Sequence, residues 1–136
     1  MPAKRRDVRE AAFLLSFEKL FRDDSLDDIF MSAKEIDEFP FDEEAENLVR
    51  GIYEKSDEID EIISKFSNKR AVSRIPKINL AILRLAIYEA LYDERVPLNV
   101  AISEAVSLTQ RYAKEPDIAF VNGILGSFSK SEEAQK

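Results

Sequence analysis

The segment from residue 78 to residue 91 is almost continuously apolar, interrupted mainly by Asn79, Arg84, Tyr88 and Glu89. A helix that is apolar nearly all round must be covered by other elements on every side. Elsewhere apolar residues recur at intervals of three and four, which is typical of amphipathic helices. Only three glycines and five prolines occur, which is little turn chemistry for a β protein. The sequence therefore predicts an all-α fold with residues 78–91 at the centre of a helical core.

The expected helices fall into two halves. The N-terminal half, about residues 3–67, begins with a helix over about residues 3–23. A second helix begins at Ser25, which forms a capping box with Asp28 three residues on. One long helical segment follows and ends near residue 66. The C-terminal half, about residues 77–129, contains the apolar helix and two helices that Pro97 and Pro116 begin. A polar, basic segment, residues 67–76, joins the halves, and we expect the tail after residue 129 to be frayed. The prediction is one compact domain, 1–136, of about seven helices in two halves that share a core.

Composition excludes several kinds of site. The chain of 136 residues has no cysteine and no histidine, which removes thiolate chemistry, the usual general base and the commonest metal ligand. No apolar run reaches the roughly 20 residues of a membrane span, and the N-terminus is not a secretory signal. We therefore expect a cytoplasmic protein with no cofactor, no metal site, no membrane contact and no enzymatic activity.

The net charge of −7 is distributed unevenly. Residues 23–61 contain 16 acidic and three basic residues, whereas the rest of the chain contains 11 acidic and 17 basic residues. A polyanion is repelled by the first region and tolerated by the second. An acidic protein of this kind is still compatible with nucleic acid, provided that the nucleic acid binds away from residues 23–61.

A cluster of cations begins the first expected helix: Lys4, Arg5, Arg6 and Arg9. Positive charge at a helix N-terminus opposes the helix dipole, so local stability does not explain the cluster. Arginine binds phosphate well because its planar fork donates two hydrogen bonds to one group. From the residues alone, a solvated N-terminus that offsets the acidic region is favoured over a phosphate-binding site, because short basic runs are common.

Two further positions are ambiguous. Arg84 lies in the apolar helix and needs a partner or a surface, either in a structural ion pair with Glu89 or Glu104 or at the edge of an RNA-binding face. Phe120 lies beside the inward face of the last helix, where it is either core or an aromatic surface for an unpaired base. Gly123 is unfavourable in mid-helix and suggests that another backbone approaches closely or that Asn122 forms a hydrogen bond there.

Several short sequence motifs, taken in their order along the chain, resemble those of the bacterial NusB family of transcription antitermination factors. They are RR at 5–6, REAA at 9–12, ILRLAIYE at 82–89, VPLNVAISEAV at 96–106 and FVNGIL at 120–125. The resemblance implies RNA binding by the arginine-rich end and by side chains of the C-terminal half. The residues expected to contact RNA are Lys4, Arg5, Arg6, Arg9, Arg84, Lys114, Phe120 and Asn122.

The sequence departs from the family pattern at three functional positions. Ala119 replaces the lysine that usually precedes the phenylalanine, so Lys114 or Arg111 would have to supply that phosphate contact. Phe17 stands where the family commonly has tyrosine, and Asn79 where it usually has an acid. In the family, these last two positions belong to the surface that binds NusE, a small-subunit ribosomal protein, so the strength of that contact is in doubt here.

The resemblance implies an antitermination factor that binds a boxA-like single-stranded RNA in nascent ribosomal RNA leaders, together with NusE and within an RNA polymerase antitermination complex. The alternative is a helical protein–protein interaction module without RNA affinity of its own. Self-association through the RNA surface, as a homodimer, also stays open. An enzyme is disfavoured because the chain has no glycine-rich cofactor loop and no cysteine nucleophile.

Overall fold

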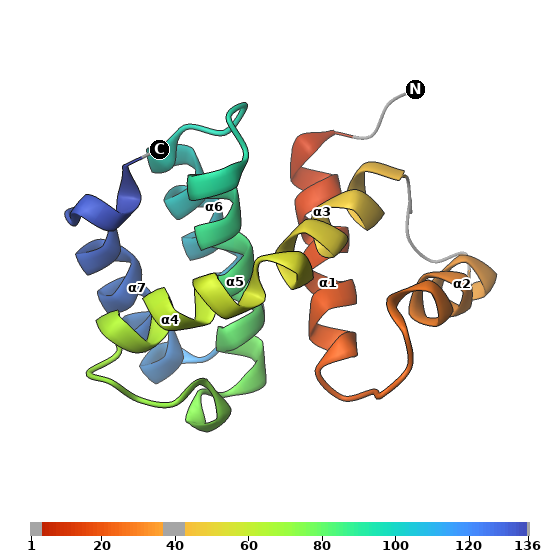
Figure 1. Ribbon diagram of the computed structural model, residues 1–136, viewed down its shortest axis with the longest axis horizontal. Helices are drawn as coiled ribbons and strands as arrows, with labels where there is room; N and C mark the ends of the chain where they lie inside the picture. The colour runs from red at the N-terminus through yellow and green to blue at the C-terminus, as the bar shows by residue number, and fades with distance from the viewer. Residues whose placement is uncertain (1–3, 37–42, 136) are drawn as a thin grey trace. The chain divides into compact units, whose positions relative to one another are not determined.

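The computed structural model describes residues 4–36 and 43–135, and every regular element there is a helix (Figure 1). This confirms the all-α prediction. The elements, in chain order, are α1 (Arg5–Lys19), α2 (Leu26–Ile36), α3 (Glu43–Glu54), α4 (Ser56–Phe66), the short 3-10 helix η1 (Val72–Arg74), α5 (Lys77–Tyr92), α6 (Leu98–Tyr112), α7 (Glu115–Ser129) and a second 3-10 helix, η2 (Glu132–Ala134).

The chain divides into two compact units, residues 1–54 and residues 55–136. In the first unit, α1 packs against both α2 and α3. Its core is formed by residues of all three helices that are almost completely buried: Val8, Ala12, Phe13, Leu15, Ile29, Phe30, Ala45, Val49 and Ile52. The predicted N-cap is confirmed, because the Ser25 hydroxyl accepts a hydrogen bond from the backbone N–H of Asp28 at 3.1 Å.

The prediction of one long helix up to residue 66 is wrong, because the segment forms two helices, α3 and α4, that are separated at Lys55. Lys55 has φ −101° and ψ 9°, outside the α-helical range, and a new helix begins at the next residue. Positions 55 and 56, between Ile52 and Ile59, are lysine and serine, so the apolar stripe is interrupted where the helix ends. As a result α4 belongs to the second unit, whereas the sequence placed these residues in the N-terminal half. The shared core expected of the two halves stays a prediction.

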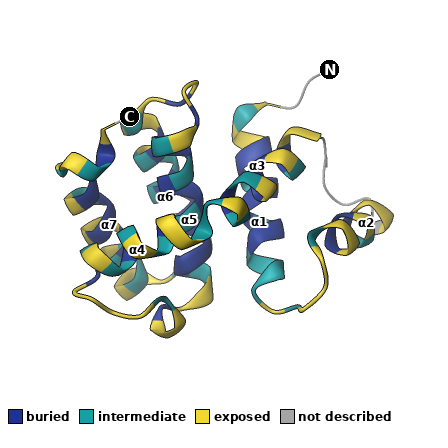
Figure 2. Ribbon diagram, in the orientation of Figure 1, coloured by how far each residue is buried: buried dark blue, intermediate teal, exposed yellow. Residues whose placement is uncertain are grey.

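In the second unit, α4, α6 and α7 all pack against α5. Figure 2 shows α5 as buried over most of its length, which agrees with the position predicted for the apolar segment. Pro97 and Pro116 lie at the starts of α6 and α7, as expected. Proline suits these positions because a first-turn N–H has no partner within the helix.

The tail after residue 129 is not frayed through residue 135. The segment forms η2, which packs against α7. Ala134 is buried, and Lys65 on α4 donates a hydrogen bond to Glu133 at 2.5 Å. The buried Ala134 and the Lys65–Glu133 ion pair hold this segment against the second unit, and the polar composition of the tail gave no indication of them.

Candidate nucleic-acid interface

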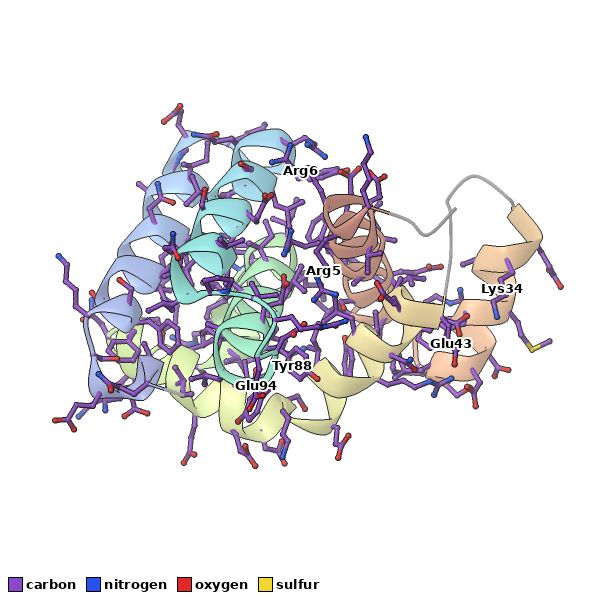
Figure 3. All side chains as sticks on the ribbon, turned by 90° about the horizontal axis from the view of Figure 1, so that it is seen from above. Arg5, Arg6, Lys34, Glu43, Tyr88 and Glu94 are labelled. Atoms are coloured by element: carbon purple, nitrogen blue, oxygen red, sulfur yellow. The ribbon has the colours of Figure 1, made fainter. Side chains whose placement is uncertain are left out.

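The cationic cluster occupies the N-terminal end of α1, where Figure 3 labels Arg5 and Arg6. Lys4 and Arg6 are exposed, Arg5 is half-buried, and Arg9 is only 4% exposed. Each of the three arginines takes part in interactions within the chain. The positive surface at this end is therefore presented mainly by Lys4 and Arg6. Burial leaves Arg9 little surface for a phosphate, and the RNA contact expected of it stays a prediction.

The backbone of this end agrees with the electrostatic reasoning from the sequence. Lys4, the N-cap residue of α1, makes no side-chain capping hydrogen bond, and the acidic residue of the first turn is Asp7. Four free N–H groups and a positive dipole end at the start of a helix attract anions. Here they lie beside exposed cations, so a phosphate bound at this end would relieve the charge repulsion.

Arg84 forms a two-point ion pair with Asp60 of α4. Its Nε donates to Asp60 Oδ1 at 2.8 Å, and its Nη2 donates to Oδ2 at 2.7 Å. The side chains of Arg84 and Asp60 are 11% and 21% exposed. The sequence favoured Glu89 or Glu104 as structural partners, and Asp60 was missed because it lies 24 residues away on another helix. The pair supports the structural interpretation of Arg84, and its RNA contact stays a prediction.

The other expected RNA contacts lie on or beside α7. Lys114 is exposed at the N-cap of α7, Asn122 is exposed, and Phe120 is half-buried. Phe120 and Asn122 project about 160° apart around the helix axis, since each residue of an α-helix turns about 100°. The structure therefore does not bring Phe120 and Asn122 to one face of α7.

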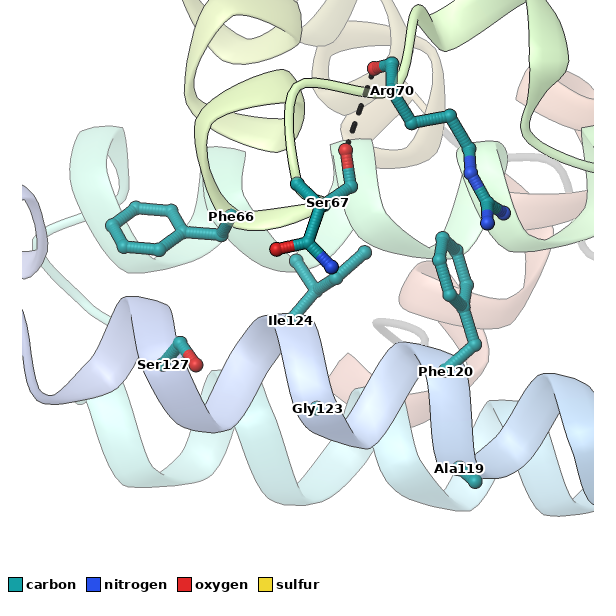
Figure 4. Close-up of a pocket in the computed structure, with 9 residues that line it drawn as sticks. Phe66, Ser67, Arg70, Ala119, Phe120, Gly123, Ile124 and Ser127 are labelled. Atoms are coloured by element: carbon teal, nitrogen blue, oxygen red, sulfur yellow. Dashed lines mark hydrogen bonds between the residues drawn. The ribbon is translucent and has the colours of Figure 1, made fainter.

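Beside Phe120 is a depression of about 370 Å³, which we call the α7 pocket (Figure 4). It lies between α7 and the segment that follows α4, both in the second unit. Its lining residues are Phe66, Ser67, Asn68, Arg70, Ala119, Phe120, Gly123, Ile124 and Ser127. The guanidinium of Arg70 lies 5.0 Å from the centre of the Phe120 ring, which is within the range of a cation–π contact.

The loop at the edge of the α7 pocket has an unusual backbone. Asn68 and Lys69 both have positive φ, 57° and 61°. The loop is closed by internal hydrogen bonds: the N–H of Lys69 donates to the carbonyl of Ser64 at 2.9 Å, and the hydroxyl of Ser67 donates to the same carbonyl at 3.2 Å. Positive φ is uncommon for lysine and is associated with constrained, functional backbone. The sequence predicts this segment only as the connection between the two halves.

Of the two explanations expected for Gly123, the close approach of another backbone is wrong, and the hydrogen bond by Asn122 stays a prediction. A Cβ atom built at Gly123 would meet nothing within 4 Å, so no second backbone approaches it. Gly123 is instead exposed and lines the α7 pocket. The glycine keeps this side of α7 flat, where any other residue would project a side chain into the pocket.

The two residues expected to bind a protein partner differ in accessibility. Phe17 is half-buried, stacks on Phe13 at 6.0 Å between ring centres, and meets Phe21 edge to face at 5.0 Å; Phe21 is 61% exposed. Asn79 is completely buried, and its Nδ2 donates to Asp117 Oδ1 at 3.0 Å. Asn79 is therefore covered within the second unit, where α7 supplies its hydrogen-bond partner. Its contact with a protein partner stays a prediction.

The expected functional residues divide between the units. Phe17 and the cationic cluster belong to the first unit, and the remaining ones belong to the second. Arg70 and its loop were missed as candidates, although the signal was present: residues 65–77 contain five basic and no acidic residues.

Over the described part of the chain, no group of three potential metal ligands occurs. No helix within those same residues has the length and apolarity needed to cross a membrane.

Comparison with known proteins identifies relatives over nearly the whole chain. The sequence model of the NusB family matches residues 6–130. The transcription antitermination protein NusB of Clostridium acetobutylicum is 39% identical over 132 residues, covering 95% of this chain and 97% of its own. The Bacillus subtilis protein of the same name is 37% identical over 130 residues, covering 96% of this chain and 98% of its own.

Solved structures agree with the sequence relatives. The structure of T. maritima NusB superposes with a TM-score of 0.81 at 34% identity, covering 96% of this chain and 94% of that one. A crystal structure of antitermination factors NusB and NusE in complex with dsRNA matches with a TM-score of 0.80 at 26% identity, covering 93% of this chain and 96% of that one.

Proposed function

Because the chain belongs to the NusB family, we propose that it is a transcription antitermination factor that binds RNA together with NusE. The observation that supports this most directly is the match of residues 6–130 to the family, with relatives of nearly equal length that have this name. A structural neighbour solved with both NusE and dsRNA supports the two partners. The RNA we propose is a boxA-like single strand of a nascent ribosomal RNA leader, and the complex assists RNA polymerase in passing terminators.

The mechanism is assembly by binding, without catalysis. Phosphates are neutralised by the cationic end of α1, where Lys4 and Arg6 are exposed, and by Lys114 at the start of α7. Unpaired bases offer their faces to aromatic side chains and their edges to polar groups, which allows sequence to be recognised without a duplex groove. Since nascent transcripts are made in the bacterial cytoplasm, we propose that the protein acts there.

We propose that NusE binds at the exposed side of the aromatic row formed by Phe13, Phe17 and Phe21, which runs along α1 and just past its end. Phe17 and Phe21 meet edge to face there, and Phe21 is exposed. A mostly apolar contact tolerates the loss of polar groups at its rim better than the loss of its centre. The missing phenol hydroxyl at position 17 then weakens the contact without removing it.

The function is tested by measuring binding to a boxA-like single-stranded RNA at several salt concentrations, with and without NusE. For single strands, the slope of log affinity against log salt is about −0.7 for each phosphate neutralised. Arg6→Ala is expected to weaken binding and to flatten the slope by about that amount. Lys34→Ala, which removes a cation paired with Glu46 in the acidic part of the first unit, is the matched control and leaves the slope unchanged.

The alternative function, a protein-binding module without RNA affinity, is favoured by one observation. Two large apolar side chains of the first unit, Phe21 and Met31, are 61% and 62% exposed. Retention of NusE binding by a protein that shows no salt-dependent RNA affinity, with NusE or without it, would establish this alternative.

A further inference from the structure

The segment that follows α7, residues 131–135, is held against the second unit, and we call it the η2 segment. Its 3-10 helix packs against α7 and buries Ala134. The hydroxyl of Ser131 donates a hydrogen bond to a carbonyl near the end of α7 at 2.6 Å. Lys65 of α4 then donates to Glu133 at 2.5 Å. Backbone and apolar contacts therefore fix the segment in one place, with a carboxylate against one particular cation.

The cation that Glu133 contacts begins the most basic part of the second unit. Residues 65–77 contain no acidic residue and five basic ones, namely Lys65, Lys69, Arg70, Arg74 and Lys77. The η2 segment has the opposite charge, since it contains two acidic residues and no basic one. A carboxylate and a phosphate both accept charge-assisted hydrogen bonds from an ammonium group. Glu133 therefore occupies Lys65 in the way that a phosphate would.

The basic segment lies beside a residue that the resemblance expects to contact RNA. Phe120 lies 5.0 Å from the guanidinium of Arg70 in that segment. Phe66 and Phe120 line the same pocket, and Lys65 precedes Phe66 in the chain. An RNA strand that reaches Phe120 therefore meets the basic segment, whose cation at the α4 end is already paired with Glu133.

We propose that the η2 segment is an autoinhibitory contact, in which Glu133 competes with an RNA phosphate for Lys65. The inference rests on the proposed RNA-binding function and adds to it a means of regulation and one phosphate-binding residue, Lys65. In the free protein the carboxylate pairs with the ammonium group, as the structure has it. In the bound protein a phosphate takes that place, and Glu133 turns to solvent.

The strength of the pair suits a contact that RNA can displace. The side chains of Lys65 and Glu133 are 59% and 36% exposed, so water and salt screen their attraction. Competition with an exposed ion pair lowers an affinity by only about 1.5- to 5-fold. Because Ala134 and Ser131 keep the segment attached, Glu133 stays at high local concentration and pairs again when RNA leaves. The contact therefore disfavours weakly bound polyanions more than an RNA that makes several further contacts.

The experiment measures the affinity of the full chain, with NusE present, for a boxA-like single-stranded RNA at several salt concentrations. Glu133→Gln is expected to raise the affinity at low salt by about 1.5- to 5-fold. It should also steepen the slope of log affinity against log salt by up to about 0.7, since one more phosphate is neutralised. Glu132→Gln removes the same charge from the exposed neighbouring residue and should leave the slope unchanged. No gain from Glu133→Gln, or an equal gain and slope change from Glu132→Gln, overturns the proposal.

Substitution of the cation separates competition from a purely structural contact. Lys65→Ala and Glu133→Gln remove the same ion pair, so both should lower the melting temperature slightly and to a similar extent. Their effects on RNA affinity should be opposite, with a loss for Lys65→Ala and a gain for Glu133→Gln. In the Lys65→Ala protein, Glu133→Gln should no longer change the affinity. A loss of affinity in both single variants, or an undiminished gain in the double variant, counts against the competition.

The proposed function and the autoinhibitory contact fail in different ways. If neither the unsubstituted protein nor its Glu133→Gln variant binds the RNA with NusE present, the proposed function itself is wrong. If the unsubstituted protein binds with the expected salt dependence and loses affinity on Arg6→Ala, but does not respond to Glu133→Gln or Lys65→Ala, only the autoinhibitory contact is wrong.

Discussion

Replacing Asp60 by alanine tests whether the Arg84–Asp60 pair is part of the fold's stability. The pair has two hydrogen bonds, of 2.8 and 2.7 Å, and its side chains are 11% and 21% exposed. Removing one partner of a fully buried ion pair costs about 3–5 kcal/mol. Because Asp60 keeps some contact with water, solvent screening reduces the expected loss to about 2 kcal/mol. For a chain of this length, that loss lowers the melting temperature by roughly 6–10 °C.

The assay is urea unfolding followed by circular dichroism, with Glu61→Ala as the control. Glu61 is the exposed acid next to Asp60 on α4, so its removal changes the charge equally and should alter the free energy of unfolding by at most about 0.5 kcal/mol. The double variant Asp60→Ala/Arg84→Met should recover part of the loss, since replacing both members of a buried pair by apolar groups is often neutral. If Asp60→Ala and Glu61→Ala unfold alike, the pair contributes nothing and the reasoning is refuted.

Three further predictions concern single side chains. Ser25→Ala should destabilise the fold by about 1 kcal/mol in chemical unfolding, because the hydroxyl caps α2; no change would show that the cap is redundant. Partial burial and then the hydrogen bond to Glu58 raise the pKa of Tyr92 to about 12, above its ordinary value near 10. The stability that this phenol contributes is therefore present below pH 10 and lost as the pH rises through about 12, and Tyr92→Phe should lack this loss in alkaline melts. Thr109→Val should change stability by less than about 1 kcal/mol, since among the residues that the structure describes its hydroxyl bonds only to the Ala105 carbonyl of its own helix; a larger loss would reveal a further partner.

The helices were predictable because their signals are local. Apolar spacing placed the central helix, and Ser25, Pro97 and Pro116 marked where helices begin, as the structure has them. The break at Lys55 was missed because a seven-residue step from Ile52 to Ile59 also fits one continuous helix. In a continuous helix a seven-residue step is nearly two full turns, so this spacing alone does not reveal a break between the two residues.

The candidate site was predictable in its residue types and less so in its geometry. Phe120 was recognised as either core or a stacking surface, and the structure places it half-buried at the edge of a pocket. Arg9 was grouped with its exposed neighbours, but it is almost completely buried. A face of a helix is defined by spacing, whereas its exposure depends on which other elements cover it.

The sequence by itself determined the all-α class, the buried segment of residues 78–91, the absence of cysteine and histidine chemistry, and the family. Only the tertiary structure decided that Arg84 pairs with Asp60, that Asn79 is covered by α7 and that Arg70 meets Phe120. The reason is distance along the chain. Helix formation and capping depend on neighbours within about four residues, but these three contacts join residues on separate elements, and chain packing alone chooses such partners.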